Sequence, residues 1–114
     1  MGEGNSAIAE RIRVQIATND VVLYMRGTPV FPQCGPSAQA AQILGFLGVP
    51  FTSLDVLEDP GLKEGLKTFS DWPTIPQLYV KGQFVGGVDI LQALGASGEL
   101  EALFRDQGLL PPAA

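Results

Sequence analysis

Apolar residues recur along the chain at two spacings, one typical of helices and the other of strands. Isoleucine stands at every fourth position between residues 7 and 18, which predicts an amphipathic helix capped by Asn5 or Ser6. The sequence VVLYM at residues 21–25 is a short, continuous apolar run, as expected of a strand that is buried on both faces. The chain is therefore predicted to begin with a helix and to continue into a central strand of a sheet.

The rest of the chain repeats this alternation of helical and strand patterns. It predicts, in order, a helix over residues 38–47, a strand over 51–56, a helix that begins at Asp59 and Pro60, strands over 77–80 and 83–86, and helices over 90–94 and 100–104. Lys81 and Gly82 form the turn of a predicted hairpin between the last two strands. Residues 109–114 are predicted to form a flexible tail.

This order of elements predicts the fold class. Strands that are separated by helices imply parallel pairing through crossover connections, and the late hairpin adds an antiparallel pair. A four-stranded mixed sheet flanked by helices on both faces accounts for the whole chain, and this α/β arrangement is the thioredoxin-like fold. The chain of 114 residues has no internal repeat or linker, so we expect one domain that spans residues 1–114.

The charge balance narrows the classes of partner. Twelve acidic residues against seven basic ones give a net charge of −5, which argues against sequence-independent binding of DNA or RNA. No apolar stretch approaches the roughly 20 residues that span a membrane, and the N-terminal sequence, with acidic Glu3 and Glu10, is not typical of a signal peptide. One cysteine allows no internal disulfide framework, so we expect a cytoplasmic protein. From the net charge and the short apolar runs we expect no nucleic-acid or membrane partner.

The single cysteine, Cys34, lies in the sequence RGTPVFPQCGPS at residues 26–37. A lone cysteine is often only a small buried side chain, but the glycine and proline neighbours of this one predict a loop that leads into a helix. A thiol at the N-terminus of a helix faces free N–H groups and the positive end of the helix dipole, which favour its reactive thiolate form. The chain has no histidine, so this thiol has no imidazole base, and zinc sites made only of cysteine and histidine are excluded.

Three separated motifs carry a resemblance to a known family. They are RGTP and FPQCGPS around Cys34, WPTIPQLYVKGQFVGG at residues 72–87, and the dipeptide DI at residues 89–90. In this order and at these spacings they resemble the monothiol glutaredoxins, which typically read KGTP, PQCGFS, WPTIPQ and GGCDI. The resemblance extends from about residue 19 to residue 107.

The chain departs from that family's usual sequence at three positions. Arg26 stands in place of lysine and keeps the positive charge. Pro36 stands in place of phenylalanine and removes one backbone N–H from the first turn of the helix that follows the cysteine. Val88 stands where many members have a second cysteine, a thiol that the core chemistry does not need.

The resemblance implies a function built on glutathione and Cys34. Members of this family bind glutathione beside the active-site cysteine, and two subunits can share one two-iron two-sulfur (2Fe–2S) cluster through two protein thiolates and two glutathione thiolates. They pass clusters to iron–sulfur acceptor proteins, often pair with BolA-type proteins, and are mostly weak reductases. The implied role is therefore a cluster carrier that is a homodimer when loaded, with Cys34 as both the reactive thiol and the iron ligand.

Two other functions are compatible with the residues. The first is a glutathione-dependent oxidoreductase that reduces protein–glutathione mixed disulfides, since one attacking cysteine is sufficient when glutathione resolves the intermediate. The second is an interaction module in which Cys34 has no chemical role. The motif favours the cluster carrier because it resembles the CGFS class and not the dithiol or CSYS classes.

The residues expected to bind glutathione follow from the same resemblance. They are Arg26, Lys63, Lys67, Ile75, Pro76, Gly87, Val88 and Asp89. Arg26 is expected near the cysteine, and Lys63 is expected to hold the glycine carboxylate of glutathione. Lys67 lies four residues further along the same helix face, where a solvated surface lysine is the alternative.

The second half of the expected site consists mainly of backbone groups. A cis Ile75–Pro76 bond would leave the Ile75 backbone free to pair with the cysteinyl part of glutathione, and a simple strand-entry proline is the alternative. The N–H groups of Val88 and Asp89 are expected to take the γ-glutamyl carboxylate, and the Asp89 side chain its ammonium group. The alternative role of Asp89 is to cap the next helix, and the two roles are compatible. Trp72 is expected to pack and not to contact the ligand.

Overall fold

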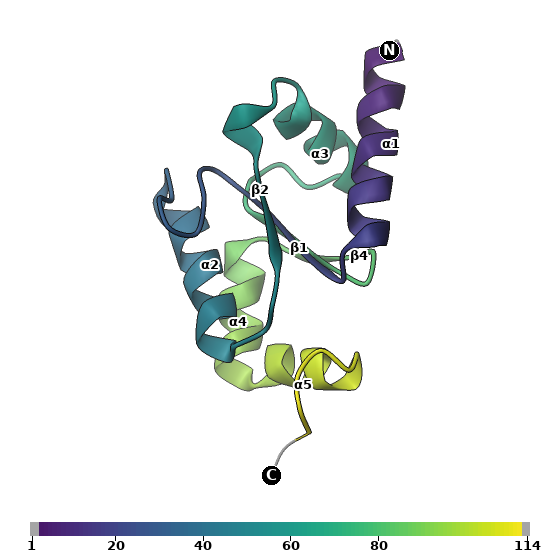
Figure 1. The fold of residues 1–114 in the computed structure, drawn as a ribbon. Coiled ribbons are helices and arrows are strands. Elements are labelled where there is room, and N and C mark those ends of the chain that lie inside the picture. Colours follow the sequence, from purple (N-terminus) through teal and green to yellow (C-terminus); the bar gives the residue numbers. More distant parts are fainter. Residues whose placement is uncertain (1–2, 113–114) are drawn as a thin grey trace.

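The structure, a computed structural model, describes residues 3–112 and has the order of helices and strands that the sequence predicts (Figure 1). The elements are α1 (Glu3–Thr18), β1 (Val21–Met25), α2 (Gly35–Leu47), β2 (Thr52–Asp55), the short 3-10 helix η1 (Val56–Glu58), α3 (Leu62–Ser70), β3 (Gln77–Val80), β4 (Gln83–Gly86), α4 (Val88–Ser97) and α5 (Glu99–Asp106).

The four strands form one mixed sheet in the order β2-β1-β3-β4. β1 pairs with β2 in parallel and with β3 antiparallel, and β3 pairs antiparallel with β4. The thioredoxin-like arrangement is therefore confirmed. In this register Met25 lies opposite Asp55, and Tyr24 lies opposite Gln77, so the ends of β1 and β2 meet the start of β3. The end of β4 joins them at the same edge of the sheet, because Gly86 lies opposite Leu78.

Helices cover both faces of this sheet. α2, α4 and α5 lie on one face, and α1 and α3 lie on the other (Figure 1). Each face has its own apolar core, and β1 contributes side chains to both cores. Leu23 packs with the first group of helices, and Val22 and Tyr24 pack with the second. All five residues of β1 are buried, which confirms the interpretation of its continuous apolar run.

Two predicted helix starts are wrong. α1 begins at Glu3, so Asn5 and Ser6 lie inside the helix and do not cap it. α3 begins at Leu62 and not at Asp59, because η1 and a turn precede it and the left-handed Gly61 (φ 89°) is the residue before its first turn. The Asp59 side chain forms an ion pair with Arg11 of α1 instead, which links the two helices on that face of the sheet.

The predicted tail is packed over most of its described length. Leu109 and Leu110 are half-buried against the core beneath α2, α4 and α5, and the Leu109 N–H donates to the Phe104 carbonyl at 2.8 Å. The Arg105 Nε donates to the Pro111 carbonyl at 3.0 Å. These contacts differ from those expected of a free tail, while residues 113–114 lie outside the described residues. Within the described part of the chain, no helix has the length and apolar character needed to cross a membrane.

Candidate functional site

Cys34 is the residue that begins α2. It has extended backbone angles (φ −157°, ψ 155°), and its carbonyl accepts the first hydrogen bond of the helix, from the Ala38 N–H at 3.0 Å. Its side chain is half-buried, and its thiol donates to the Ser37 hydroxyl with a sulfur–oxygen distance of 3.1 Å. Pro36 lies within the first turn. The structure thus confirms the predicted loop-to-helix position of the thiol.

Ser37 is a residue of the candidate site that the sequence analysis missed. Its side chain is fully buried, and its hydroxyl accepts from the Arg26 N–H at 3.0 Å as well as from Cys34. The Gln33 N–H also donates to the Arg26 carbonyl, at 2.9 Å. Residues 26–34, called the cysteine loop below, are therefore closed back onto the end of β1. A sequence signal was available, because a polar side chain three residues after a helix cap often forms a hydrogen bond with the cap residue.

A second polar side chain, Asp55, fastens the cysteine loop to the neighbouring strand. Its carboxylate accepts from the Gly27 N–H at 2.8 Å and from the Leu57 N–H at 2.9 Å. Gly27 has a positive φ of 86°, and a Cβ atom there would lie 2.5 Å from the Phe31 carbonyl oxygen, so the tight turn requires glycine. Asp55 was also missed, because nothing in its local sequence distinguishes it from a surface aspartate.

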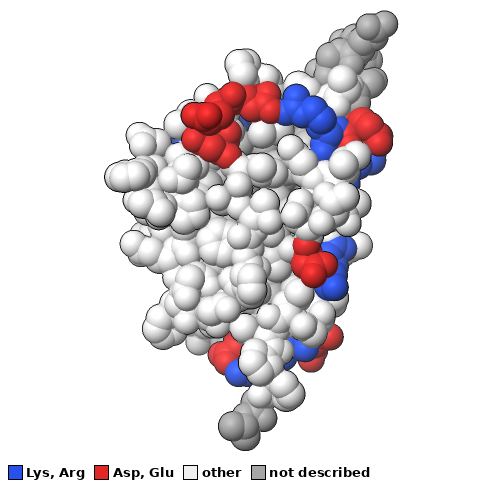
Figure 2. All heavy atoms as spheres, viewed as in Figure 1, with Lys and Arg blue, Asp and Glu red and all other residues white. Residues whose placement is uncertain are grey.

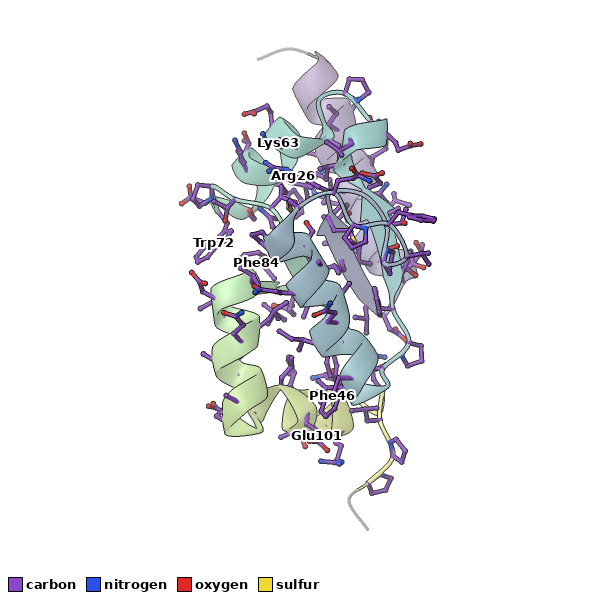
Figure 3. The ribbon with its side chains drawn as sticks, turned by 90° about the vertical axis from the view of Figure 1, so that its left-hand side faces the viewer. Arg26, Phe46, Lys63, Trp72, Phe84 and Glu101 are labelled. Carbon is purple, nitrogen blue, oxygen red and sulfur yellow. The ribbon has the colours of Figure 1, made fainter. Side chains whose placement is uncertain are left out.

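The positive charges of the chain divide into two groups. Five of the seven basic residues form ion pairs: Arg11, Arg13, Lys67, Lys81 and Arg105. The other two, Arg26 and Lys63, have no ion-pair partner among the side chains that the structure describes. Both side chains are half-buried and lie at the same end of the molecule (Figure 3). They are the cations best placed to receive an external anion.

Lys67 differs from these two cations. It lies one turn after Lys63 on α3, but its ammonium group is 3.4 Å from the Glu64 carboxylate. An ion pair of this kind on a helix surface contributes little stability. Lys67 can therefore leave Glu64 and bind a ligand carboxylate instead. Its predicted contact with glutathione stays a prediction.

The Ile75–Pro76 peptide bond is cis, as the sequence analysis expects. Both residues are buried, and in the described part of the chain neither the N–H nor the carbonyl of Ile75 has a hydrogen-bond partner. The fully buried Gln77 holds the preceding loop, because its side-chain amide donates to the carbonyls of Trp72 (3.2 Å) and Thr74 (3.3 Å). Gln77 is the third residue of the site that sequence reasoning missed.

The end of β4 forms a turn over residues 86–89, called the glycine turn below. Gly87 is the residue before α4, whose first turn contains Val88 and Asp89. The first N–H groups of an α-helix have no acceptor within the helix. The cap residue is Gly87, which has no side chain, and Asp89 lies inside the first turn, so the alternative in which Asp89 is the cap residue is wrong. Val88 is half-buried, whereas the Asp89 carboxylate is exposed and forms no ion pair with a described side chain.

A line of aromatic rings extends from the glycine turn, where Trp72 lies beside Gly87, into the core. Trp72 packs against Phe84 with ring centroids 5.7 Å apart, Phe84 against Tyr79 at 5.4 Å, and Tyr79 against Tyr24 at 5.7 Å. Figure 3 shows Trp72 and Phe84 close together at the edge of the molecule. Burial raises the pKa of Tyr79 to about 12 and also raises the pKa of Tyr24. The Tyr79 hydroxyl donates to the Gln77 side-chain oxygen at 3.2 Å.

The sheet topology explains why these distant segments meet. Arg26 follows β1, η1 and α3 follow β2, Pro76 precedes β3, and the glycine turn follows β4, so all four lie at one edge of the sheet. Because β3 lies between β1 and β4, Pro76 lies between the cysteine loop and the glycine turn. Beside this edge, acidic side chains gather over η1, whereas the middle of the same face is uncharged (Figure 2).

The donor atoms of this site limit the metal chemistry that one chain can support. Among the described residues there is no group of three or more His, Cys, Asp or Glu side chains that could hold a metal ion. Cys34 is the one thiol of the chain. A metal centre at this site would therefore need ligands from outside the chain.

The sequence was compared with known proteins. Residues 21–85 match the sequence pattern of the glutaredoxin family. A monothiol glutaredoxin named ycf64-like from Synechocystis is 48% identical over 101 residues, which are 89% of this chain and 94% of that protein. The mitochondrial monothiol glutaredoxin-5 of Saccharomyces cerevisiae is 46% identical over 111 residues, which are 95% of this chain and 74% of that protein.

The fold was compared with solved structures. The solution structure of a monomeric truncated mutant of Trypanosoma brucei 1-C-Grx1 is similar with a TM-score of 0.83 and 39% identity, and the match covers 93% of this chain and 96% of that one. The crystal structure of a buckwheat glutaredoxin–glutathione complex has a TM-score of 0.85 and covers 97% of this chain and 99% of that one. Its 15% identity limits the likeness to the fold.

Proposed function

The chain belongs to the glutaredoxin family, among its monothiol members, and on that premise we propose that it binds glutathione and assembles or transfers a 2Fe–2S cluster as a glutathione-bridged homodimer. The observation that carries the proposal is the position of Cys34: one half-buried thiol per chain, at the start of α2 and at the sheet edge where Arg26 and Lys63 lie.

The number of thiols supports a shared cluster. A 2Fe–2S cluster normally takes four thiolate ligands, and this chain supplies one, from Cys34. Two chains and two glutathione molecules together supply the full set. The cluster is cargo in this proposal, and the chain's own contribution is to hold one thiolate at a helix N-terminus, where free N–H groups favour negative charge.

The charges around the site match those of glutathione. Glutathione carries two carboxylates and one ammonium group, and the site offers Arg26 and Lys63, the free N–H groups at the start of α4, and the exposed carboxylate of Asp89. Arg26 can hold a carboxylate with two parallel donors, where lysine offers a point charge. The unpartnered backbone of Ile75 suits an extended peptide ligand. The buckwheat glutaredoxin, a distant relative in sequence, is described as a glutathione complex.

Anaerobic reconstitution with iron, sulfide and glutathione tests the proposal. The wild type should gain the visible absorbance of a 2Fe–2S cluster, and this gain should need glutathione. Cys34→Ser should abolish the absorbance, whereas Ser97→Ala, at an exposed hydroxyl on the far end of α4, should leave it unchanged. A cluster that forms equally well without glutathione, or in Cys34→Ser, would contradict the proposal.

A glutathione-dependent reductase is the second candidate, because the half-buried Cys34 is the one group that a monothiol mechanism needs. In that mechanism the Cys34 thiolate attacks the glutathione sulfur of a protein–glutathione disulfide and releases the protein thiolate. A free glutathione thiolate then attacks the Cys34–glutathione disulfide, which yields glutathione disulfide and regenerates Cys34. A turnover equal to that of a dithiol glutaredoxin in a parallel assay would favour this function.

The partners and location belong to the same proposal. We propose that the loaded form is the homodimer, and that a BolA-type protein and iron–sulfur acceptor proteins bind at the Cys34 edge of the sheet. A cytoplasmic location rests on the single free thiol and the lack of a disulfide framework. The yeast relative is named as a mitochondrial protein, so fractionation of cells that express the tagged chain is the direct measurement.

A further inference from the structure

The two neighbouring glycines of the glycine turn are needed for different reasons. Gly86 has φ 153°, an angle that side-chain-bearing residues rarely adopt, and a Cβ atom there would also lie 2.7 Å from the Ile90 Cβ. Gly87 has φ −97° and ψ −165°, which other residues adopt without strain. The backbone conformation therefore does not explain why position 87 has no side chain.

The Trp72 indole ring explains it. A Cβ atom at position 87 would lie 2.9 Å from the Trp72 Nε1 and 3.7 Å from its Cε2, both atoms of the five-membered ring. The third of the three nearest atoms is the Pro76 carbonyl oxygen, at 3.3 Å. The indole thus occupies the space in which a side chain at position 87 would lie, and it does so beside the cis-proline.

The indole is held in this position by packing. Its Nε1 is buried and, among the described residues, is the one such side-chain nitrogen or oxygen without a hydrogen-bond partner. Phe84 packs against the ring at 5.7 Å, the Trp72 backbone N–H donates to Ser70 at 3.1 Å, and the Trp72 carbonyl accepts from Gln77 at 3.2 Å. A buried N–H without a partner is unfavourable, so the ring contacts must outweigh this cost.

From this geometry we infer that Trp72 is a positioning residue for glutathione. It sets the path of the glycine turn, so that the Val88 and Asp89 N–H groups point toward the ligand carboxylate, and it requires glycine at position 87. Trp72 does not itself touch the ligand. This inference rests on the proposed function, because it assigns a role within the proposed glutathione site.

The test is a double-mutant cycle between positions 72 and 87. Reduced glutathione is titrated into the ¹⁵N-labelled protein, and the amide signals of Val88 and Asp89 give the dissociation constant. Gly87→Ala should weaken binding about tenfold, which corresponds to the loss of one backbone hydrogen bond to a charged group. In the Trp72→Phe background, which lacks the five-membered ring, the same change should weaken binding less than about threefold. Gly95→Ala is the matched control, because a Cβ atom there makes only an ordinary contact, 3.8 Å from Ile43.

A second readout comes from Trp72 itself. The chain contains one tryptophan, so its indole N–H gives a single signal. A carboxylate bound at the Val88 and Asp89 N–H groups changes the electric field at the neighbouring indole, so this signal should shift with the same dissociation constant as the Val88 amide. A merely structural tryptophan would keep an unchanged signal through the titration.

Each outcome is decisive. If no amide of the wild type responds to glutathione, the proposed function fails, and the inference fails with it for that separate reason. If the wild type binds but Gly87→Ala weakens binding equally in both backgrounds, or not at all, or the indole signal does not shift, Trp72 is not the positioning residue. If Gly87→Ala unfolds the protein, Trp72→Phe should restore folding, and a double variant that stays unfolded would overturn the inference.

Discussion

The cysteine loop is held by polar side chains, whereas the glycine turn on the other side of Pro76 is held by aromatic packing. Asp55 and Ser37 accept hydrogen bonds from backbone N–H groups of the cysteine loop and of its neighbours. At the glycine turn no side chain caps α4, and the Trp72 and Phe84 rings pack beneath it. A hydrogen bond depends on the direction between donor and acceptor, whereas packing depends on how completely side chains fill the space between them. The cysteine loop should therefore be sensitive to the loss of an acceptor, and the glycine turn to the loss or gain of a few atoms.

The largest effect is expected from the aromatic support. Phe84→Ala removes the ring between Trp72 and Tyr79, and a cavity of this kind should lower the free energy of unfolding by about 3 kcal/mol. Phe46→Ala is the control, because the Phe46 side chain is 91% exposed, at the opposite end of the molecule from Lys63 (Figure 3). Denaturant unfolding of both variants measures the difference. An equal effect of the two substitutions would show that the rings do not support the turn.

A smaller loss is expected when the cysteine loop loses an acceptor. Asp55→Ala leaves the Gly27 and Leu57 N–H groups without their partner and should cost about 2 kcal/mol. Asp20→Ala is the matched control, since Asp20 is exposed and its ion pair with Lys81 (3.2 Å) should be worth less than about 1 kcal/mol. If Asp55→Ala unfolds at the same denaturant concentration as the control, Asp55 does not fasten the loop.

The smallest effect at neutral pH is expected from the Tyr79 hydroxyl, and this effect should depend on pH. Tyr79→Phe removes the hydroxyl that donates to Gln77 and should cost about 1 kcal/mol at neutral pH. The Tyr79 pKa is about 12 in the folded protein, above the usual value near 10. Because the folded state therefore binds this proton more tightly than the unfolded state, the protonated hydroxyl makes its full contribution to stability below pH 10. That stabilisation is lost as the pH rises from 10 through 12, and because one pKa unit is worth about 1.4 kcal/mol, the gap between wild type and variant should narrow above pH 10 and change sign before pH 12.

Unfolding titrations of wild type and Tyr79→Phe at pH 8, 10 and about 11.5 measure this gap. Tyr24 is present in both proteins, but the charge of Tyr79 is one cause of its raised pKa after burial, so the change in the gap reports the two tyrosines together. A gap that stays constant over this range would mean that the Tyr79 hydroxyl titrates alike in the folded and unfolded chains.

The sequence predicted the loop and backbone parts of the site better than its buried polar side chains. Arg26, Pro76 and the glycine turn were expected at the site from the motifs shared with monothiol glutaredoxins, and the observed strand order brings them to one edge of the sheet, because β1 and β4 end where the antiparallel β3 begins. Cys34 could be placed at a helix start because glycine and proline follow it directly. These are local signals or consequences of strand order, and both can be read from one sequence.

Three polar residues of the site escaped prediction, and for Asp55 and Ser37 the reason is physical. The Asp55 carboxylate accepts from the Gly27 N–H, 28 residues away, and the Ser37 hydroxyl accepts from the Arg26 N–H, 11 residues away. No local pattern encodes such a contact. The start of α3 was misplaced for the same reason, since the ion pair with Arg11 that engages Asp59 comes from a different helix.

Native mass spectrometry of the reconstituted protein tests the central claim most directly. Cys34 is the one thiol of each chain, so the loaded species should contain two chains, one 2Fe–2S cluster and two glutathione molecules. Cys34→Ser, treated in the same way, should appear only without a cluster. A species with one chain that carries a cluster, or with two chains and a cluster but no glutathione, would contradict the account.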